Sequence, residues 1–224
     1  MSGFLTPVAT IAWKDVLLEL RTRDIIVSVL VFALLVVIVF QFAVAPTPEL
    51  AKQVAPGLLW VAFAFAGTLA VNRTFTLERD KGSLEGLLLC PVSRDTLFFG
   101  KALGVAVFML VVEAMLLPLF AVLFNFPSFT PGLLLAAFLG TIGFAAVGTL
   151  FSAVAVNTRS REVMLPVLFF PVVLPVIIAA AEASAGAVSG APWAEWSKWI
   201  KLIGVFDAIF LVVPPWVFGY VLEE

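Results

Sequence analysis

Long apolar runs, separated by short polar segments, set the pattern of the whole chain. Six of them approach the roughly 20 residues that a helix needs to cross the hydrocarbon core of a bilayer. They cover about residues 25–45, 54–71, 97–124, 131–156, 163–181 and 202–221. The runs are continuous rather than alternating, which excludes a transmembrane barrel, so we predict six transmembrane helices.

Before the first run, residues 11–24 carry apolar and polar side chains on opposite faces of a helix. This spacing predicts an amphipathic helix that lies in the membrane surface. The apolar face consists of Ala12, Trp13, Val16, Leu17 and Leu20, and the polar face of Lys14, Asp15, Glu19 and Arg21. The alternative is a solvated extension of the first span.

Basic residues are divided unequally between the two sets of loops. One set holds Lys14, Arg21, Arg23, Arg73, Arg79, Lys81, Arg94, Lys101, Arg159 and Arg161, and the other holds Lys52, Lys198 and Lys201. Because cytoplasmic loops carry the excess of Lys and Arg, both termini are predicted to face the cytoplasm.

The composition supports a membrane protein and excludes several kinds of binding site. Of the 224 residues, 62% are hydrophobic and 12% are charged, whereas soluble domains carry about a quarter charged residues. The net charge of −2 comes without a basic tail, so no nucleic-acid partner is expected. Histidine is absent and Cys90 is the only cysteine, which excludes an internal disulfide and the usual metal ligand. We predict one all-α transmembrane domain over residues 1–224 and no bound metal.

Two of the spans have distinctive residue patterns. In the fourth span, small residues recur at every fourth position, which predicts close helix packing within the chain or with another subunit. They are Ala137, Thr141, Ala145, Thr149 and Ala153, widened by Gly140, Gly143 and Gly148. The fifth span contains Pro166, Pro171 and Pro175. Each proline removes a backbone donor and can kink the helix, and a structural role is preferred to a moving pathway.

Three tryptophans, Trp193, Trp196 and Trp199, lie three residues apart on the predicted outer side. Tryptophan favours the membrane–water interface, so an interfacial anchor is the first interpretation. Stacking on a flat ligand such as haem, or docking of a partner, is the alternative. Two acids, Glu113 and Asp207, lie inside spans, where such groups usually face a partner or a wet cavity. Protonation, hydrogen bonding and pairing with another subunit stay open for both.

The segment Thr76 to Asp95, "TLERDKGSLEGLLLCPVSRD", is charged and lies between two apolar runs. The second span is predicted to continue as a helix to Gly82, a residue suited to a helix C-terminus. Residues 83–90 then predict a short helix that ends before Pro91, with Leu84, Leu87 and Leu88 as its apolar contacts. Ser93 is a candidate N-cap for the next helix. An isolated helix this short is unstable in water, so it needs a lipid or protein surface.

This loop resembles that of ABC-2-type exporter permeases. The matching residues are Glu78, Arg79, Gly82, Leu84, Glu85, Leu87, Pro91, Gly100 and Lys101. The resemblance implies that residues 83–90 form a coupling helix seated on an ATPase subunit. The implied ATPase-coupling residues are Glu78, Arg79, Gly82, Ser83, Leu84, Glu85, Leu87, Leu88 and Pro91.

The stretch Ala55 to Phe75, "APGLLWVAFAFAGTLAVNRTF", is similar to the second span of the CcmB family, the haem-exporter permeases of cytochrome c maturation. This resemblance implies a multi-pass protein of the bacterial inner membrane. The implied partners are a CcmA-like ATPase that binds ATP and magnesium, a CcmC-like haem-handling subunit, a small CcmD-like subunit, a CcmE-like haem chaperone and membrane lipid.

Haem is expected as the substrate of the complex and not as a cofactor bound by this chain. Without histidine, the available haem ligands beyond the first residue are Met109, Met115, Met164, Cys90 and Tyr220. The chain also has no Walker motif, so ATP hydrolysis is assigned to a partner and the chain is not expected to be an enzyme. A generic ABC-2 permease for lipid, drug or polysaccharide is the alternative. A secondary transporter or an intramembrane enzyme is disfavoured, because related halves and catalytic motifs are missing.

Overall fold

The computed structural model describes residues 2–22, 24–44, 48–80, 82, 86, 89–125, 129–156, 158 and 161–223. Within these ranges the regular structure is entirely helical. The helices are α1 (Ser2–Thr22), α2 (Asp24–Val44), α3 (Pro48–Asp80), α5 (Arg94–Phe124), α6 (Pro131–Val156), α7 (Arg161–Val188) and α8 (Trp193–Glu223). The all-α prediction is therefore confirmed for the described part of the chain.

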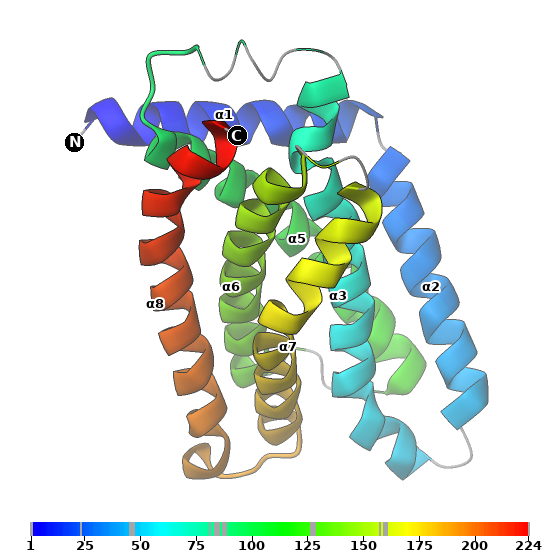
Figure 1. The fold of residues 1–224 in the computed structure, drawn as a ribbon. Helices are drawn as coiled ribbons and strands as arrows, with labels where there is room; N and C mark the ends of the chain where they lie inside the picture. The colour runs from blue at the N-terminus through cyan, green and yellow to red at the C-terminus, as the bar shows by residue number, and fades with distance from the viewer. Residues whose placement is uncertain are drawn as a thin grey trace.

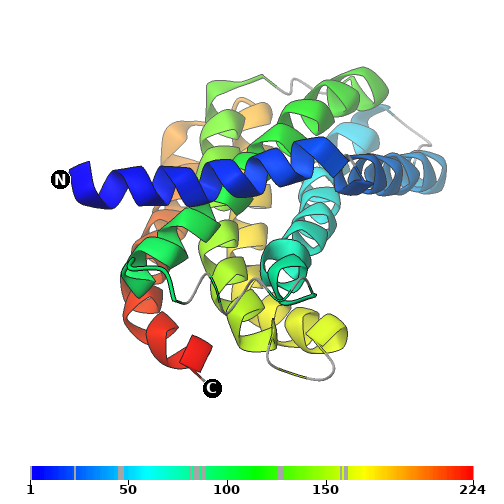
Figure 2. The same cartoon turned by 90° about the horizontal axis from the view of Figure 1, so that it is seen from above.

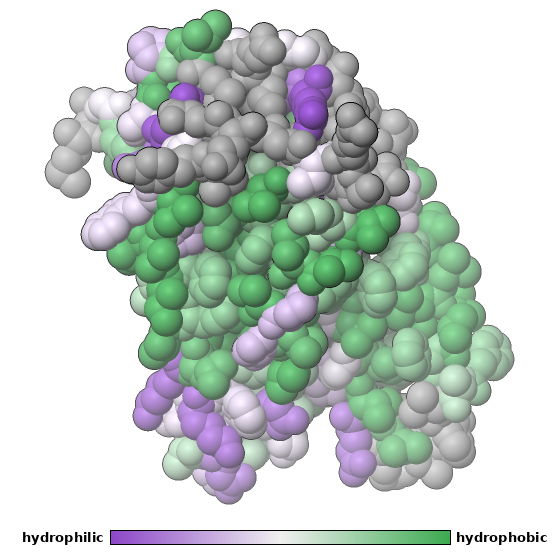
Figure 3. All heavy atoms as spheres, in the orientation of Figure 1, coloured by the Kyte–Doolittle hydropathy of each residue, from purple (hydrophilic) through white to green (hydrophobic). Residues whose placement is uncertain are grey.

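Among the residues that the structure describes, five helices are long and apolar enough to cross a membrane. Their spans are Gln53–Asn72, Arg94–Phe124, Pro131–Ala155, Val163–Val188 and Trp193–Gly219. They match the last five predicted runs, and Figure 3 shows a broad apolar band across the visible face of the bundle. The first predicted run corresponds to α2, an apolar helix of 21 residues (Asp24–Val44). The part of it found apolar among the described residues is Val27–Phe40. The sixth crossing stays a prediction.

Both termini lie at the same end of the bundle, as Figure 1 shows. Helix α1 lies across this end, and the other helices run along the bundle away from it. Lys14, Arg94 and Lys101 belong to this end, which we call the basic end; the other is the opposite end. The arrangement agrees with the predicted grouping of the termini, while their cytoplasmic location stays a prediction.

Helix α1 differs from the predicted amphipathic helix in its length and its orientation. It begins at Ser2 rather than at residue 11, and it crosses over α5 when the bundle is seen from above (Figure 2). Ile11 and Ala12 are buried, whereas Trp13, predicted on the same face as Ala12, is 61% exposed. The predicted polar face is also not simply solvated, because Asp15 turns towards α5. Asp15 forms an ion pair there with Lys101.

Helix α6 lies inside the bundle and contacts α3, α5, α7 and α8. Ala137, Thr141, Ala145, Thr149 and Ala153 are all buried, which confirms close packing within the chain. A Cβ on Gly140 would overlap the Trp60 ring of α3, so the glycine lets the two helices approach. The Trp60 indole in turn donates a hydrogen bond of 3.0 Å to Ser184 Oγ on α7.

The three prolines of the fifth predicted span do not interrupt its helix. Helix α7 continues through Pro166, Pro171 and Pro175. Figure 1 shows that it changes direction along its length, from an oblique upper part to a lower part that follows α6. Bending of this kind is what a missing backbone donor produces in a helix.

Candidate functional site

The predicted coupling segment, residues 83–90, lies mostly outside the described residues, but its two borders are well defined. Helix α3 ends at Asp80, and Gly82 has a φ of 64°, the left-handed conformation that favours glycine at a helix C-terminus. Ser93 caps α5, since its Oγ accepts a hydrogen bond of 3.3 Å from the Thr96 backbone N–H. These ends confirm that α3 extends beyond its apolar run and that Ser93 is an N-cap.

Ser83, Leu84, Glu85, Leu87 and Leu88 are among the residues whose placement is not described. The described residues next to them face outwards: Leu89 is 84% exposed, and Arg79 and Pro91 are exposed as well. An exposed leucine beside a short polar loop offers an apolar contact to another molecule. The coupling role of this segment stays a prediction.

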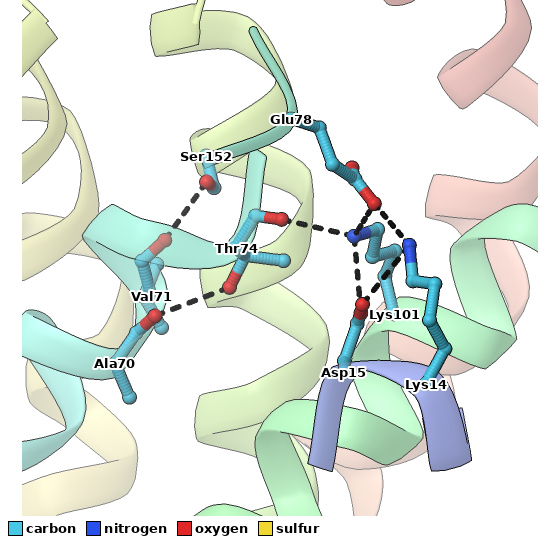
Figure 4. A network of polar contacts seen from close by, with 8 residues as sticks. All are labelled: Lys14, Asp15, Ala70, Val71, Thr74, Glu78, Lys101 and Ser152. Carbon is cyan, nitrogen blue, oxygen red and sulfur yellow. Dashed lines mark hydrogen bonds and ion pairs between the residues drawn. The ribbon is translucent and has the colours of Figure 1, made fainter. Parts of the chain in front are cut away.

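A compact group of charges joins α1, the last turns of α3 and the first turns of α5. We call it the charge cluster; it consists of Lys14, Asp15, Glu78 and Lys101 (Figure 4). The Lys101 ammonium lies 3.0 Å from Asp15 Oδ2 and 2.7 Å from Glu78 Oε1. It also donates a hydrogen bond of 3.0 Å to the Thr74 carbonyl oxygen. With only 1% of its side chain exposed, Lys101 is held by acceptors from two other helices.

Lys14 completes the cluster from its exposed side. Its ammonium contacts Glu78 Oε1 and lies 3.2 Å from Asp15 Oδ1. Burial lowers the pKa of Lys14, but the hydrogen bond to Glu78 and the charges of Asp15 and Glu78 outweigh burial and raise it above 10.5. The two ammonium groups and two carboxylates leave the cluster formally neutral, which limits the cost of desolvating them together.

Two glycines of α5 let α1 approach closely enough to form the cluster. A Cβ on Gly100 would lie 2.8 Å from Ile11 Cβ, and one on Gly104 would lie 3.4 Å from Asp15 Cβ. Gly100, Lys101 and Gly104 therefore work together: the glycines provide the space for α1, and the lysine pairs with its Asp15. A cavity of about 70 Å³ beside the cluster is lined by Glu19, Thr74 and Phe108 among others.

The position of Glu78 differs from that of an exposed docking residue. Its carboxylate is buried in the charge cluster, whereas the neighbouring Arg79 is exposed. Glu78 lies three residues before Lys81 and less than a helical turn from the end of α3. It therefore connects the last turn of α3 to α1 and α5.

The two acids inside spans occupy different surroundings on either side of α6. Glu113 of α5 accepts a hydrogen bond of 2.8 Å from Thr141 Oγ1. Asp207 of α8 faces Gly143, where a Cβ would overlap its Oδ1. Neither carboxylate oxygen of Asp207 has a hydrogen-bond partner among the residues that the structure describes. Within the same ranges, no group of three acids or cysteines is arranged to hold a metal ion.

The hydrogen bond between Thr141 and Glu113 can be tested with a matched pair of variants. Thr141→Val removes the donor and is expected to lower the free energy of unfolding by about 1 kcal/mol. Thr149→Val is the control, because Thr149 is equally buried on the same helix and its Oγ1 has no partner in the described structure. Stability is measured by unfolding in mixed detergent micelles. Equal loss in both variants would contradict the assigned hydrogen bond.

The three tryptophans of the opposite end do not share one exposed face. Trp193 is 55% exposed and contacts Trp196 edge to face at 4.5 Å between ring centroids. Trp196 is half-buried, and its indole donates a hydrogen bond of 3.2 Å to the Ala191 carbonyl oxygen. Trp199 packs against the main hydrophobic core. Only Trp193 is placed like a simple interfacial anchor.

The sequence pattern grouped Lys101 with the basic residues of the loops and did not predict the charge cluster. The usable signals were the Gly100–Lys101 pair near the start of a span and Asp15 on a helix that contains buried apolar neighbours. Neither signal identifies its partner, because the ion pair joins Asp15 and Lys101, which lie more than 60 positions apart in the sequence. The cluster depends on the packing of α1 on α5, which the sequence pattern does not predict.

Comparison with known proteins gives a consistent result. The family model described as "CcmB protein" matches residues 6–224. Heme exporter protein B of Pseudomonas aeruginosa is 31% identical over 164 residues, which cover 73% of this chain and 74% of that protein. The protein of that name from Rhodobacter capsulatus is 31% identical over 75% of this chain and 78% of its own length. The one from Paracoccus denitrificans is 30% identical, with coverage of 80% and 82%.

Proposed function

The chain belongs to the CcmB family, and from this premise we propose that it is the membrane permease subunit of an ABC-type haem exporter in cytochrome c maturation. The family match over residues 6–224 is the observation that carries the proposal. The relatives named Heme exporter protein B support haem as the exported substrate. The basic end then faces the cytoplasm of a bacterium, in agreement with the positive-inside rule.

In this proposal, the segment 83–90 is a coupling helix that seats on a CcmA-like ATPase subunit. ATP and magnesium bind to that subunit, because this chain has no Walker motif, and the chain is a transporter subunit and not an enzyme. ATP binding moves the segment, and α3 and α5 move with it because they border it directly. Gly82 and Ser93 limit the segment and support this division into rigid helices and a short docking piece.

The charge cluster supports mechanical coupling through its position. It ties the last turns of α3 to the first turns of α5 and to α1 through buried ion pairs. A movement of one helix end is then transmitted to the other two, because separating Lys101 from its acceptors would leave a buried ammonium unpaired. The cluster thus provides a stiff connection where the proposed force enters.

Haem handling is assigned to partner subunits. A CcmC-like subunit holds haem, a CcmD-like subunit completes the complex, and a CcmE-like chaperone receives haem on the periplasmic side. The chain lacks histidine, which removes the commonest axial haem ligand from its own inventory.

Affinity purification of the tagged chain from its native membrane in mild detergent tests this assignment. The expected result is recovery of an ATPase together with a haem-bearing membrane subunit. Recovery of an ATPase without any haem-handling protein would instead favour a generic ABC-2 permease for lipid, drug or polysaccharide. Isolation of the chain without an ATPase, with transport by the chain alone, would contradict the ABC-type assignment.

A further inference from the structure

A groove opens at the opposite end of the bundle, where α3 begins, α7 ends and α8 begins. Its volume is about 750 Å³, and Pro56, Trp196 and Trp199 are among the apolar residues that line it. Glu182, Glu195 and Lys198 also line it. The groove is therefore neither a purely apolar slot nor a purely charged surface.

The wall formed by Trp196 is fixed by packing as well as by its hydrogen bond. A Cβ on Gly186 of α7 would lie 2.6 Å from Trp196 Cβ, so the glycine admits the tryptophan against α7. A Cβ on Gly132 of α6 would lie 2.8 Å from the far edge of the same ring. With its indole N–H bonded to Ala191, the ring is positioned before any ligand enters.

The three charged side chains of the groove are exposed. None of them makes an ion pair with another residue in the described part of the chain. The Lys198 ammonium lies 5.2 Å from the centre of the Trp199 ring, which holds the cation beside the groove wall. Two carboxylates and one ammonium that form no ion pair within the described structure are complementary to a ligand that carries both a cationic and an anionic group.

The connection between α7 and α8, which borders the groove, is expected near the level of the lipid headgroups. The spans of α7 and α8 end at Val188 and begin at Trp193, which places their connection at the edge of the apolar layer. Figure 3 shows hydrophilic residues gathered at this end, next to the apolar band. Leu202 and Val205, farther along α8, are exposed and lie within the span, where they offer a surface for acyl chains.

From these observations we propose that the groove binds the headgroup of an aminophospholipid, of the phosphatidylethanolamine type, from the surrounding leaflet. The primary ammonium of the lipid contacts Glu182 and Glu195, and its phosphate contacts Lys198. A primary ammonium donates hydrogen bonds to carboxylates, whereas the quaternary ammonium of phosphatidylcholine has no N–H to donate. Haem fits the charges poorly, because its two carboxylates would face two glutamates. This site is independent of the proposed coupling role.

Native mass spectrometry of the purified chain tests the proposal. The chain is released from detergent in the presence of equal amounts of phosphatidylethanolamine, phosphatidylcholine and phosphatidylglycerol with identical acyl chains. We expect phosphatidylethanolamine to be retained about fivefold more than either of the others, the effect of two exposed charge contacts. In the Glu182→Gln/Glu195→Gln double variant, its retention should fall to that of phosphatidylcholine.

Two lysine variants separate the groove from general surface charge. Lys198→Gln should lower retention of all three lipids, since each carries the phosphate that Lys198 would contact. Lys201→Gln should keep the original pattern, because Lys201 is exposed on the same helix but does not line the groove. Equal retention of the three lipids by the original chain, or an unchanged preference in the double variant, would overturn the proposal. So would a photoreactive group at Ser189 that crosslinks in native membranes to a protein and not to lipid.

Discussion

Lys101→Met is expected to lower the free energy of unfolding by about 3 kcal/mol, because it leaves the carboxylates of a largely buried ion-pair group without their central cation. Lys101 has only 1% of its side chain exposed and contacts Asp15, Glu78 and the Thr74 carbonyl oxygen. Methionine fills a similar volume, so lost packing contributes little to the effect. Unfolding of the purified chain in mixed detergent micelles, followed by tryptophan fluorescence, measures it.

Lys14→Met is the matched control for this variant. Lys14 contacts the same two carboxylates, but 41% of its side chain is exposed, so water can replace the contacts. A loss of about 1 kcal/mol or less is expected for it. If both lysine variants lost the same stability, the central position assigned to Lys101 would be wrong. Lys101→Arg keeps the positive charge, so it should lower the free energy of unfolding less than Lys101→Met does.

Gly140→Leu is expected to destabilise the bundle by a comparable amount, about 3 kcal/mol, through overpacking between α6 and α3. Even a Cβ at this position would overlap the Trp60 ring, and the ring is held by its hydrogen bond to Ser184 Oγ. The leucine must therefore separate the helices or displace the ring and break that hydrogen bond. The same unfolding assay measures the effect.

Gly204→Leu provides the control within a span. A Cβ on Gly204 would have no heavy atom within 4 Å, and the residue is exposed on α8, so leucine there should change stability little. Equal effects at the two glycines would mean that the result reflects helix propensity or hydrophobicity and not packing against Trp60.

The membrane-spanning part of the fold was largely predictable, because a bilayer imposes a length and a composition on each span. All six predicted runs correspond to helices, and the helix ends at Gly82 and Ser93 follow from local chemistry that the sequence carries. Helix α2 (Asp24–Val44) also has the length that the first run predicts. Its crossing of the membrane stays a prediction, because the part of it found apolar among the described residues is Val27–Phe40.

Contacts between distant segments were not predictable in the same way. Asp15 was placed on a polar face because its helix was considered alone, yet in the structure it pairs with Lys101 of α5. The tryptophans of α8 were grouped by their spacing. In the structure, Gly186 and Gly132 on other helices leave the space in which the Trp196 side chain packs. In both cases the residue that determines the position of the side chain belongs to another helix, and the pattern of a single helix contains no information about it.

The proposed mechanism makes a specific demand on residues 83–90. The segment has to contact an ATPase subunit through its leucines and pass movement to α3 and α5. A positive charge at Leu84 would oppose burial of that contact, whereas Leu84→Met would keep an apolar side chain of similar volume. In the proposed mechanism Leu84 contacts the ATPase subunit and not the bundle, so both variants should fold.

Haem delivered per ATP hydrolysed, measured for the reconstituted complex with a periplasmic haem chaperone as acceptor, tests the coupling role most directly. With Leu84→Arg, we expect haem delivery to fall at least about tenfold, equivalent to about 1.4 kcal/mol of lost coupling. Stability of the chain should be unchanged, and Leu84→Met should behave like the original protein. Full-rate, ATP-dependent delivery by a Leu84→Arg complex that retains its ATPase subunit would contradict the account.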